Sequence, residues 1–330
     1  MFRFSGRTFP LAVALIVLIA LIAMGLAPQA YAQAYPAKPL RLLVPFAPGG
    51  VSDIVARVVT PRLAEALGQS VVVENRVGAG GVIATELVAK AAPDGYTLLT
   101  VFDNFAANPY LYKSATYDPV KNFAPIGQAV RSRIVVVVNP RLDVKTLDEL
   151  VRLSSVRKDA LTYASAGGGT SSHLIAELLK LTTGIEATAV HYKGGSPAMT
   201  DLLGGQVDMM VATMSIALQH VRAGKLNAIA VTSSNRTPLL PGVPAVGETY
   251  PGFEAQSWVG FVAPAGTPRA IITRLNAELG RAVAMPEVRE KLEGLGFEIA
   301  QGTPEAFGEW IASESARWSR VIRERRITVE

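Results

Sequence analysis

An alternation of two hydrophobic patterns constrains the fold of this chain more than any other feature. Short runs of branched apolar residues are separated by segments in which apolar residues recur with helical spacing. The runs at residues 40–44 and 133–138 show little polar alternation, which indicates strands buried on both faces. Such strands, separated by helices, predict an open, doubly wound α/β sheet whose parallel strands are covered by helices on both faces.

The same scheme occurs in both halves of the chain, so the sequence predicts two sheets in two lobes. A length of 330 residues allows two domains of ordinary size. Strands are expected at residues 40–44, 70–73, 96–102, 133–138, 161–164, 188–192, 207–211 and 228–232. Helices are expected at residues 54–67, 82–91, 171–182, 197–203, 271–284, 286–295 and 304–325.

Proline, threonine and tryptophan add local expectations. Thr267-Pro268 and Thr303-Pro304 each combine an N-cap hydroxyl with a first-turn proline, so both predict helix starts. Pro61 lies inside a helical pattern and is expected to kink or split that helix. The residues interpreted as core or helix-packing side chains are Trp258, Trp310 and Trp318.

The N-terminus has the three parts of a secretory signal peptide. Arg3 and Arg7 precede an apolar run at residues 11–26, and Ala30-Tyr31-Ala32 supplies small residues for cleavage before Gln33. The alternative is a membrane anchor, because the apolar run approaches the length of about 20 residues that a span requires. The cleavage site and the polar sequence after it favour a removed signal peptide and a soluble periplasmic product.

Composition excludes several classes of function. The chain has no cysteine, which excludes disulfides and thiolate metal sites. Its net charge of +5 falls to +3 when residues 1–32, with two arginines and no acidic residue, are removed, so nucleic-acid binding is not expected. The P-loop and G-x-S-x-G patterns are absent, and the three histidines lack metal-ligand spacing. We interpret His173 as a residue that hydrogen-bonds within a helix-start turn rather than as a catalytic base.

Three segments place a Gly/Ser-rich turn between a strand and a helix, at residues 45–53, 163–173 and 192–201. Backbone N–H groups in the first turn of a helix lack partners, and the helix dipole makes that end partly positive. Glycines let a ligand approach this backbone, so such turns can bind an anion without a charged side chain. The alternative is that Ser52, Asp53 and Ser196 only cap helices, as residues of these types do in many βα units.

Phe102 and Phe105 bracket Asp103-Asn104 just after a predicted strand. Ligands of open α/β sheets bind outside the carboxyl ends of the strands, so these two rings are placed near the expected cleft. They either wall a pocket for an apolar or aromatic ligand or lie buried beneath the loop. The sequence leaves both alternatives open.

Many ordered motifs give the chain a family resemblance. They include YPAKPL at residues 35–40, VPFAPGG at 44–50, VENR at 73–76, PDGYTLL at 93–99, DLLGGQV at 201–207 and APAGTP at 263–268. With these runs the chain resembles, over essentially its whole mature length, the substrate-binding proteins of tripartite tricarboxylate transporters, the Bug family.

The resemblance implies a two-lobed, type II-like periplasmic binding protein that closes around its ligand like a flytrap. Lobe 1 would comprise residues 33–130 and 255–330, lobe 2 residues 131–254, and residues 1–32 the signal peptide. The resemblance further implies no catalytic activity and no cofactor, and the residues themselves predict no metal site. Its ligand would be a small organic carboxylate, passed by a monomeric protein to membrane permease subunits. The alternatives are a ligand sensor that feeds a signalling partner, or an α/β enzyme acting on a carboxylate.

The ligand-binding residues expected from the turns and the resemblance come from both lobes. Val211 and Ala212 occupy positions where the family often has Phe-Asp, which argues against an amino-acid ligand. The identity of the carboxylate stays open. The candidate residues are Phe46, Ala47, Gly49, Ser52, Asn104, Ser165, Gly167, Thr170, Ser171, Tyr192, Ala212 and Thr213.

Overall fold

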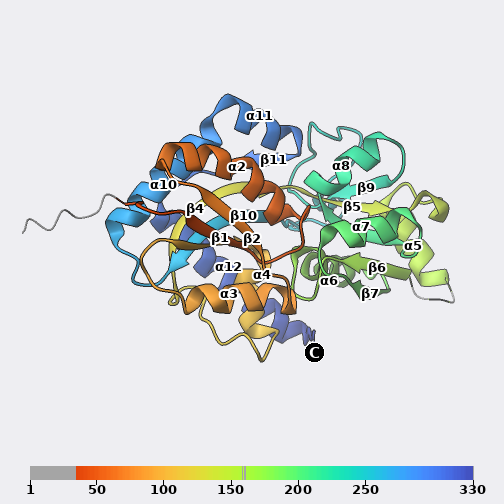
Figure 1. Ribbon diagram of the computed structural model, residues 1–330. Coiled ribbons are helices and arrows are strands. Elements are labelled where there is room, and N and C mark those ends of the chain that lie inside the picture. Colours follow the sequence, from red (N-terminus) through yellow and green to blue (C-terminus); the bar gives the residue numbers. More distant parts are fainter. Residues whose placement is uncertain (1–34, 158, 160, 330) are drawn as a thin grey trace, which may run out of the picture. The chain divides into compact units, whose positions relative to one another are not determined.

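The computed structural model describes residues 35–157, 159 and 161–329 (Figure 1). The predicted signal peptide and its cleavage site lie outside the described residues. Residues Lys38–Glu330 form one compact unit, which is described here by itself. No helix in the described part of the chain is long and apolar enough to cross a membrane.

The first sheet has six strands in the order β11-β4-β10-β3-β1-β2. Strand β1 pairs in parallel with β2 and β3, whereas β10 is antiparallel to both β3 and β4, and β11 is antiparallel to β4. The strands are β1 (Leu40–Val44), β2 (Val71–Asn75), β3 (Thr97–Phe102), β4 (Phe123–Ser132), β10 (Ser257–Pro264) and β11 (Phe297–Ile299).

The second sheet has five strands in the order β7-β6-β8-β5-β9. Strand β6 pairs in parallel with β7 and β8, whereas β5 is antiparallel to β8 and β9. The strands are β5 (Ile134–Val138), β6 (Leu161–Ser165), β7 (Ala187–His191), β8 (Met209–Thr213) and β9 (Asn227–Val231).

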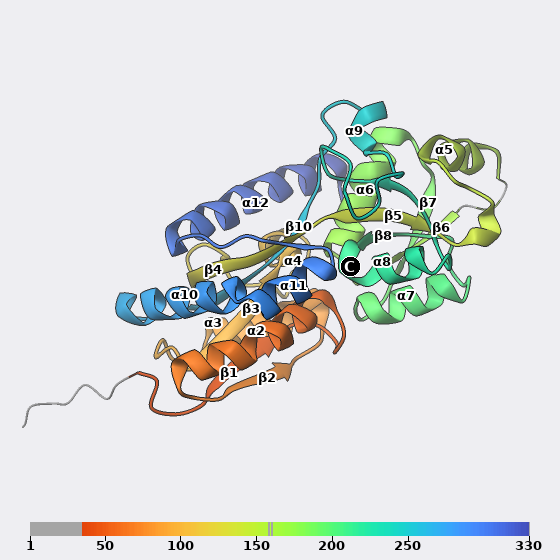
Figure 2. The same ribbon diagram turned by 90° about the horizontal axis from the view of Figure 1, so that it is seen from above.

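The predicted α/β class with two sheets is confirmed, but each sheet is mixed rather than wholly parallel. The reason is that the chain crosses between the sheets. Strand β4 of the first sheet continues into β5 of the second with Arg133 alone between them, and the chain returns to the first sheet as β10 (Figure 2). Strand β4 ends at Ser132, just beyond the predicted lobe boundary at residue 130. The lobe boundaries themselves stay a prediction.

Helices flank both sheets (Figures 1 and 2). They are α2 (Val51–Leu67), α3 (Val82–Ala89), α4 (Asp103–Ala107), α5 (Leu147–Val156), α6 (Ser171–Thr183), α7 (Gly195–Leu203), α8 (Met214–Arg222), α9 (Val246–Thr249), α10 (Arg269–Ala284), α11 (Pro286–Gly294) and α12 (Pro304–Arg325). Short 3-10 helices lie at η1 (Ala79–Gly81), η2 (Asn108–Tyr110) and η3 (Pro140–Leu142).

The local expectations had mixed outcomes. Pro61 lies within α2, which continues from Val51 to Leu67, so the proline does not split the helix, and a kink there stays a prediction. Thr303 caps α12 by accepting a hydrogen bond from the N–H of Ala306 at 3.1 Å, as predicted. Thr267 does not cap α10; its hydroxyl instead donates to the carbonyl of Pro264 at 2.8 Å, and α10 begins two residues later.

The apolar runs of the sequence form the cores of the two sheets. All five residues of β5 and all eight of β10 are buried, as expected for strands covered on both faces. Trp258 and Trp318 lie in these cores, whereas Trp310 is only partly buried. Both sheets therefore provide rigid supports for the turns at their strand ends.

Candidate functional site

The turn after β1 is ordered by the carboxylate of Asp53. Its Oδ2 accepts hydrogen bonds from the backbone N–H of Gly49 and from Nε of Arg57, both at 2.9 Å. Nδ2 of Asn75 donates to Oδ1 of Asp53 at 2.9 Å and to the carbonyl of Phe46 at 2.8 Å. Burial alone would raise the pKa of Asp53, but the hydrogen bonds from Arg57, Gly49 and Asn75 lower it. The carboxylate thus holds the turn that leads into α2.

The turn after β6 is ordered by its own hydroxyl groups. Oγ1 of Thr170 donates to the carbonyl of Gly167 at 2.7 Å and lies 2.9 Å from Oγ of Ser172. Ser172 in turn accepts a hydrogen bond from the N–H of Ala166 at 2.7 Å. Gly167 has a φ of 137°, a conformation that favours glycine. The hydroxyl of Thr170 therefore shapes the loop and is fully buried.

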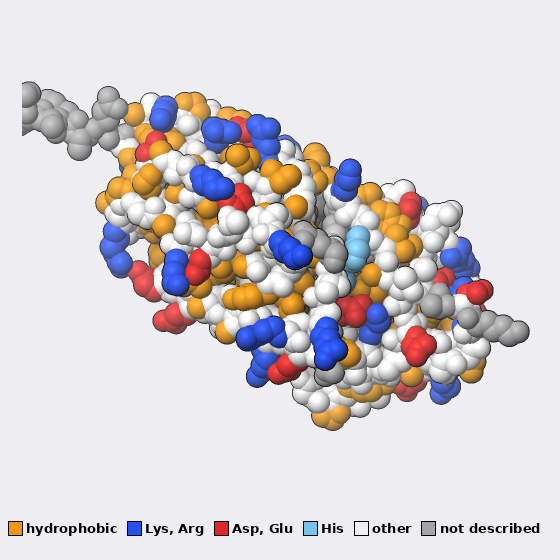
Figure 3. All heavy atoms as spheres, turned by 90° about the horizontal axis from the view of Figure 1, so that it is seen from below, with side chains coloured by type: hydrophobic (Ala, Val, Ile, Leu, Met, Phe, Trp, Pro, Cys, Tyr) orange, Lys and Arg blue, Asp and Glu red, His pale blue; other side chains and the backbone are white. Residues whose placement is uncertain are grey.

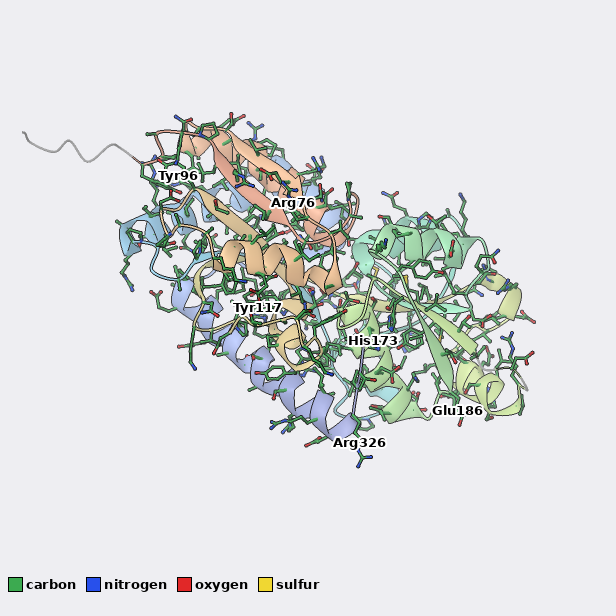
Figure 4. The ribbon with its side chains drawn as sticks, turned by 60° about the horizontal axis from the view of Figure 1, so that its bottom comes forward. Arg76, Tyr96, Tyr117, His173, Glu186 and Arg326 are labelled. Atoms are coloured by element: carbon green, nitrogen blue, oxygen red, sulfur yellow. The ribbon has the colours of Figure 1, made fainter. Side chains whose placement is uncertain are left out.

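His173 is the third residue of α6 and lies on the side of the second-sheet elements that borders the first-sheet elements (Figure 4). Its Nδ1 accepts a hydrogen bond from the N–H of Gly169 at 3.0 Å, which confirms its interpretation as a helix-turn residue. Burial and the neighbouring ring of His191, 4.7 Å away, lower the pKa of His173 to about 4. His173 is therefore neutral at neutral pH.

The turn after β7 places its tyrosine against α7. The hydroxyl of Tyr192 donates to Oδ2 of Asp201 at 2.7 Å. Burial and this carboxylate raise the pKa of Tyr192 to about 12. Gly194, with a φ of 137°, then starts α7. The phenol hydroxyl is therefore engaged by α7, although Tyr192 also borders a pocket described below.

The three helices after these turns begin without side-chain caps. The N-cap residues of α2, α6 and α7 are Gly50, Thr170 and Gly194, and none accepts a capping hydrogen bond through a side chain. Oγ of Ser52 is buried and has no hydrogen-bond partner among the described residues. Ser52, Asp53 and Ser196 are thus not the N-cap residues of these helices, and their contact with a ligand stays a prediction.

A small central cavity lies where the three turns meet. Its volume is about 30 Å³, which leaves room for little more than ordered water. The cavity brings together five of the predicted ligand-binding residues, namely Phe46, Ser52, Thr170, Ser171 and Thr213. The other lining residues are Gly50, Val51, Phe102, Ala166, Ser172, Gly195, Met210 and Ile216.

A larger side pocket of about 240 Å³ adjoins this cavity, because Phe46 and Ala166 line both. The predicted residues Gly167 and Tyr192 border it. Its remaining lining residues are Pro45, Val77, Gly78, Ala79, Gly80, Gly81 and Lys193. The glycine-rich segment from 78 to 81 was not among the residues predicted for the site.

The other predicted residues line neither pocket. Nδ2 of Asn104 donates to the carbonyl of Gly80, and Oγ of Ser165 lies 2.6 Å from Nδ1 of His191. Ala212 is fully buried in the core of the second sheet. The last two, Ala47 and Gly49, belong to the turn after β1 and lie beside the turn after β7, near Gly194 and Ser196.

The two phenylalanines near the cleft have different environments. Phe102 lines the central cavity and packs edge-on against Phe46, with ring centroids 6.0 Å apart. Phe105 instead packs among Tyr117 and Phe123, beneath the loop. Of the two alternatives predicted for these rings, Phe102 therefore forms part of a pocket wall, whereas Phe105 lies buried beneath the loop.

The electrostatics of the site come from backbone dipoles more than from ionised side chains. Among the described residues, no Lys, Arg, Asp, Glu or His lines the central cavity. In the part of the chain that the structure describes, no cluster of His, Asp and Glu could hold a metal ion. Basic and acidic side chains are interspersed over the face shown in Figure 3, without one continuous basic patch. The cavity is thus suited to a small anion held by N–H and O–H groups.

Comparison with known proteins gives a consistent family. The family described as the tripartite tricarboxylate transporter family receptor matches residues 55–327. Protein BugT of Bordetella pertussis is 39% identical over 303 residues, which covers 91% of this chain and 93% of BugT.

Solved structures agree with this result. The periplasmic binding protein BugD is 37% identical with a TM-score of 0.84, covering 88% of this chain and 98% of BugD. Rpa4515 of R. palustris, solved with adipate, is 35% identical with a TM-score of 0.84, covering 88% of this chain and 97% of its own. MatC of Rhodopseudomonas palustris, solved with malate, is 34% identical with a TM-score of 0.83, covering 87% of this chain and 100% of MatC.

Proposed function

The chain belongs to the tripartite tricarboxylate transporter receptor family, and from this membership we propose that it captures a small organic carboxylate between two α/β lobes and delivers it to a membrane permease. The family is one of periplasmic solute-binding proteins rather than enzymes. Relatives solved with adipate and malate support a dicarboxylate as the ligand class. We also propose that residues 1–32 direct export and are removed before Gln33.

The observation that carries the proposal is the meeting of three helix N-termini at one cavity. Residues at the starts of α2, α6 and α7 line it together, and α2 flanks the first sheet while α6 and α7 flank the second. Each helix start is free of a side-chain cap, so its N–H groups remain available to a ligand. A carboxylate there would interact with the positive ends of three dipoles at once.

Ligand selection in this proposal depends on hydrogen bonds rather than on ion pairs. Ser171 and Thr213 supply hydroxyls to the cavity wall, and Phe46 and Phe102 supply apolar surface. This mixture is typical of small-ligand sites, where a few polar groups orient a largely apolar contact. Lys193 borders the side pocket, where a second carboxylate of a longer diacid could bind.

Capture requires the lobes to open, because a cavity of about 30 Å³ cannot admit a diacid as it stands. The crossing segments near Arg133 and between β9 and β10 are where the sheets connect, so we propose that hinge motion occurs there. A ligand that contacts both lobes then favours the closed state by its higher affinity for it. The permease would recognise this closed state.

A thermal-shift screen of the mature protein tests the proposal. The panel contains adipate, malate, tricarboxylates, aromatic acids and amino acids. A ligand at 100 times its dissociation constant should add about 2.7 kcal/mol of stability, which raises the melting temperature visibly. Mass spectrometry should recover the stabilising compound unaltered. Consumption of the compound, or stabilisation by none of the acids when the protein is free of bound ligand, would contradict the proposal.

A further inference from the structure

Asp103 is a buried carboxylic acid with an unused hydrogen-bonding atom. It is the first residue of α4, directly after Phe102 of the cavity wall, and its side chain is 1% exposed. Oδ1 accepts a hydrogen bond from the N–H of Trp258 at 2.9 Å. Oδ2 has no hydrogen bond of good geometry to the described residues. A buried carboxyl with an unpartnered oxygen needs a functional explanation.

The hydroxyls of Ser171 and Ser257 lie beside this carboxyl, close enough to lower its pKa. Oγ of Ser257 is itself buried and, among the described residues, without a hydrogen-bond partner. Ser171, at the start of α6, lines the central cavity. Ser171 therefore borders both the carboxyl of Asp103 and the cavity where the ligand would bind.

Burial outweighs the neighbouring hydroxyls and the N–H of Trp258, and it raises the pKa of Asp103 to about 7. Glu314 of α12 is a charged group that acts on Asp103 and raises its pKa further. Glu314 is already engaged by Arg317 at 3.5 Å and by Nε1 of Trp318 at 3.1 Å. On α6, His173 is neutral near pH 7, and no Lys or Arg of the described residues forms an ion pair with Asp103.

The protonation state of Asp103 decides which way the single O–H of Ser171 points. An ionised Asp103 attracts that O–H, so Oγ of Ser171 would face the ligand as an acceptor and repel a carboxylate. A neutral Asp103 can donate its own O–H to Oγ of Ser171. The O–H of Ser171 is then free to donate to the ligand. The negative charge of a bound carboxylate also favours the neutral form of Asp103.

We propose that Asp103 is a positioning residue that orients the hydroxyl of Ser171 toward an anionic ligand and takes up one proton when that ligand binds. This inference rests on the proposed function as a carboxylate-binding protein. It goes beyond that function by making ligand capture dependent on pH. The affinity for the ligand is highest when Asp103 is neutral, and it falls as rising pH ionises Asp103 in the ligand-free protein.

Isothermal titration calorimetry with adipate and malate measures this coupling. Because ligand-free Asp103 ionises around pH 7, the dissociation constant should increase about tenfold from pH 6.5 to pH 8. His173 stays neutral throughout this range and does not contribute. Titrations at pH 8 in two buffers of different ionisation enthalpy should report the uptake of about one proton per ligand bound.

The substitution Asp103→Asn removes the titrating proton and keeps the shape of the side chain. The amide keeps an acceptor for the N–H of Trp258 and supplies a donor for Ser171 at every pH. The variant should bind with an affinity that is constant from pH 6.5 to pH 8 and tighter than that of the wild type at pH 8. Glu314→Gln should shift the midpoint of the wild-type profile to lower pH, because it removes a charge that favours neutral Asp103. Asp94→Asn, at an exposed position, should leave the profile unchanged.

The outcomes separate two kinds of failure. A wild-type affinity that is constant with pH and accompanied by no proton uptake would overturn the role of Asp103 while leaving carboxylate binding intact. Loss of ligand binding in a folded Asp103→Asn protein would also overturn it. If neither protein binds adipate, malate or any other acid of the panel at any pH, the proposed function fails, and the proton coupling fails with it.

Discussion

Asn75 donates a hydrogen bond from Nδ2 to Oδ1 of Asp53 at 2.9 Å, joining the end of β2 to the first turn of α2. The same nitrogen donates to the carbonyl of Phe46 at 2.8 Å. One amide thus holds both the acid that organises the turn and the residue that lines the two pockets. A side chain outside the pockets therefore determines the geometry of the site.

Replacing Asn75 with alanine should loosen this turn. The change leaves Oδ1 of Asp53 and the carbonyl of Phe46 without their donor, which should lower the free energy of unfolding by about 1–3 kcal/mol. Ligand affinity should fall as well, because Phe46 is less firmly placed. Urea unfolding and calorimetry measure the two effects.

The pH dependence of the same variant gives a second test. The lowered pKa of Asp53 contributes stability above its unfolded-state pKa, and this stability is lost as pH falls through the folded-state pKa. Without Asn75 the folded-state pKa rises, so acid unfolding should begin at a higher pH. Asn235→Ala, which removes one 3.4 Å contact at an exposed site, is the control and should change stability by less than about 0.5 kcal/mol. Equal behaviour of the two variants would contradict the assignment.

Thr170 and Ser171 are neighbours with different roles, which paired substitutions should separate. Thr170→Val removes a buried hydroxyl that donates to Gly167, so it should lower stability by about 1–3 kcal/mol. Ser171→Ala removes a hydroxyl from the cavity wall and should weaken ligand binding by about 1–3 kcal/mol with a smaller loss of stability. Thermal melts and ligand titrations of both variants check this division. If both variants retain full affinity, the turn after β6 is not part of the site.

The sequence predicted the elements whose pattern is simple. Runs rich in apolar residues correspond to β1 and β5, and Gly/Ser-rich turns correctly marked the starts of α2, α6 and α7. Strands β4 and β10 were not predicted, because Pro125, Gly127 and Gly260 interrupt their patterns. Gly260 is required there by packing: a Cβ would come within 2.1 Å of the Phe307 ring. Their antiparallel pairing reflects contacts between distant segments, which a local pattern does not encode.

The site was predictable at the level of turns but not of individual hydroxyls. Ser165, Thr170 and Tyr192 were expected to contact ligand because of their type and position. In the structure their hydroxyls interact with His191, Gly167 and Asp201 respectively. The direction of a hydroxyl depends on tertiary neighbours. For the same reason the sequence did not predict the burial of Asp103, because this burial results from packing against β10 and α12.

Gly169 marks a close approach between second-sheet and first-sheet elements. Its φ is 76°, and a Cβ would come within 2.6 Å of Leu111 and 2.9 Å of Oδ1 of Asn108. Gly184, at the other end of α6, has a φ of 79° with no atom of the described residues within 4 Å of its Cβ position. Alanine at Gly184 should cost about 1–2 kcal/mol of stability for the backbone conformation alone.

Alanine at Gly169 should cost about 1–3 kcal/mol more than alanine at Gly184, because the overpacked contact adds to the same backbone penalty. The extra methyl group should also push Gly169 away from Leu111 and Asn108, so Gly169→Ala should weaken ligand binding and Gly184→Ala should not. Melting curves with and without ligand measure both effects. Equal ligand-induced shifts in the two variants would show that closure does not depend on this contact.

Asp103 should also be detectable in the protein without ligand. Its pKa of about 7 in the folded state lies above the ordinary value of 3.8. The contribution of Asp103 to folding stability is therefore fully present below about pH 4 and is lost as pH rises to about 7, because the buried carboxyl must then ionise. The side-chain amide of the variant Asp103→Asn carries no charge, so the variant should be more stable than the wild type above pH 7, by up to about 4 kcal/mol. The difference should shrink toward pH 4. Urea unfolding of both proteins at pH 5, 6, 7 and 8 measures it, and other titrating groups cancel in the difference. Parallel stability curves would show that Asp103 titrates normally, and would remove the physical basis for a proton-dependent capture of ligand.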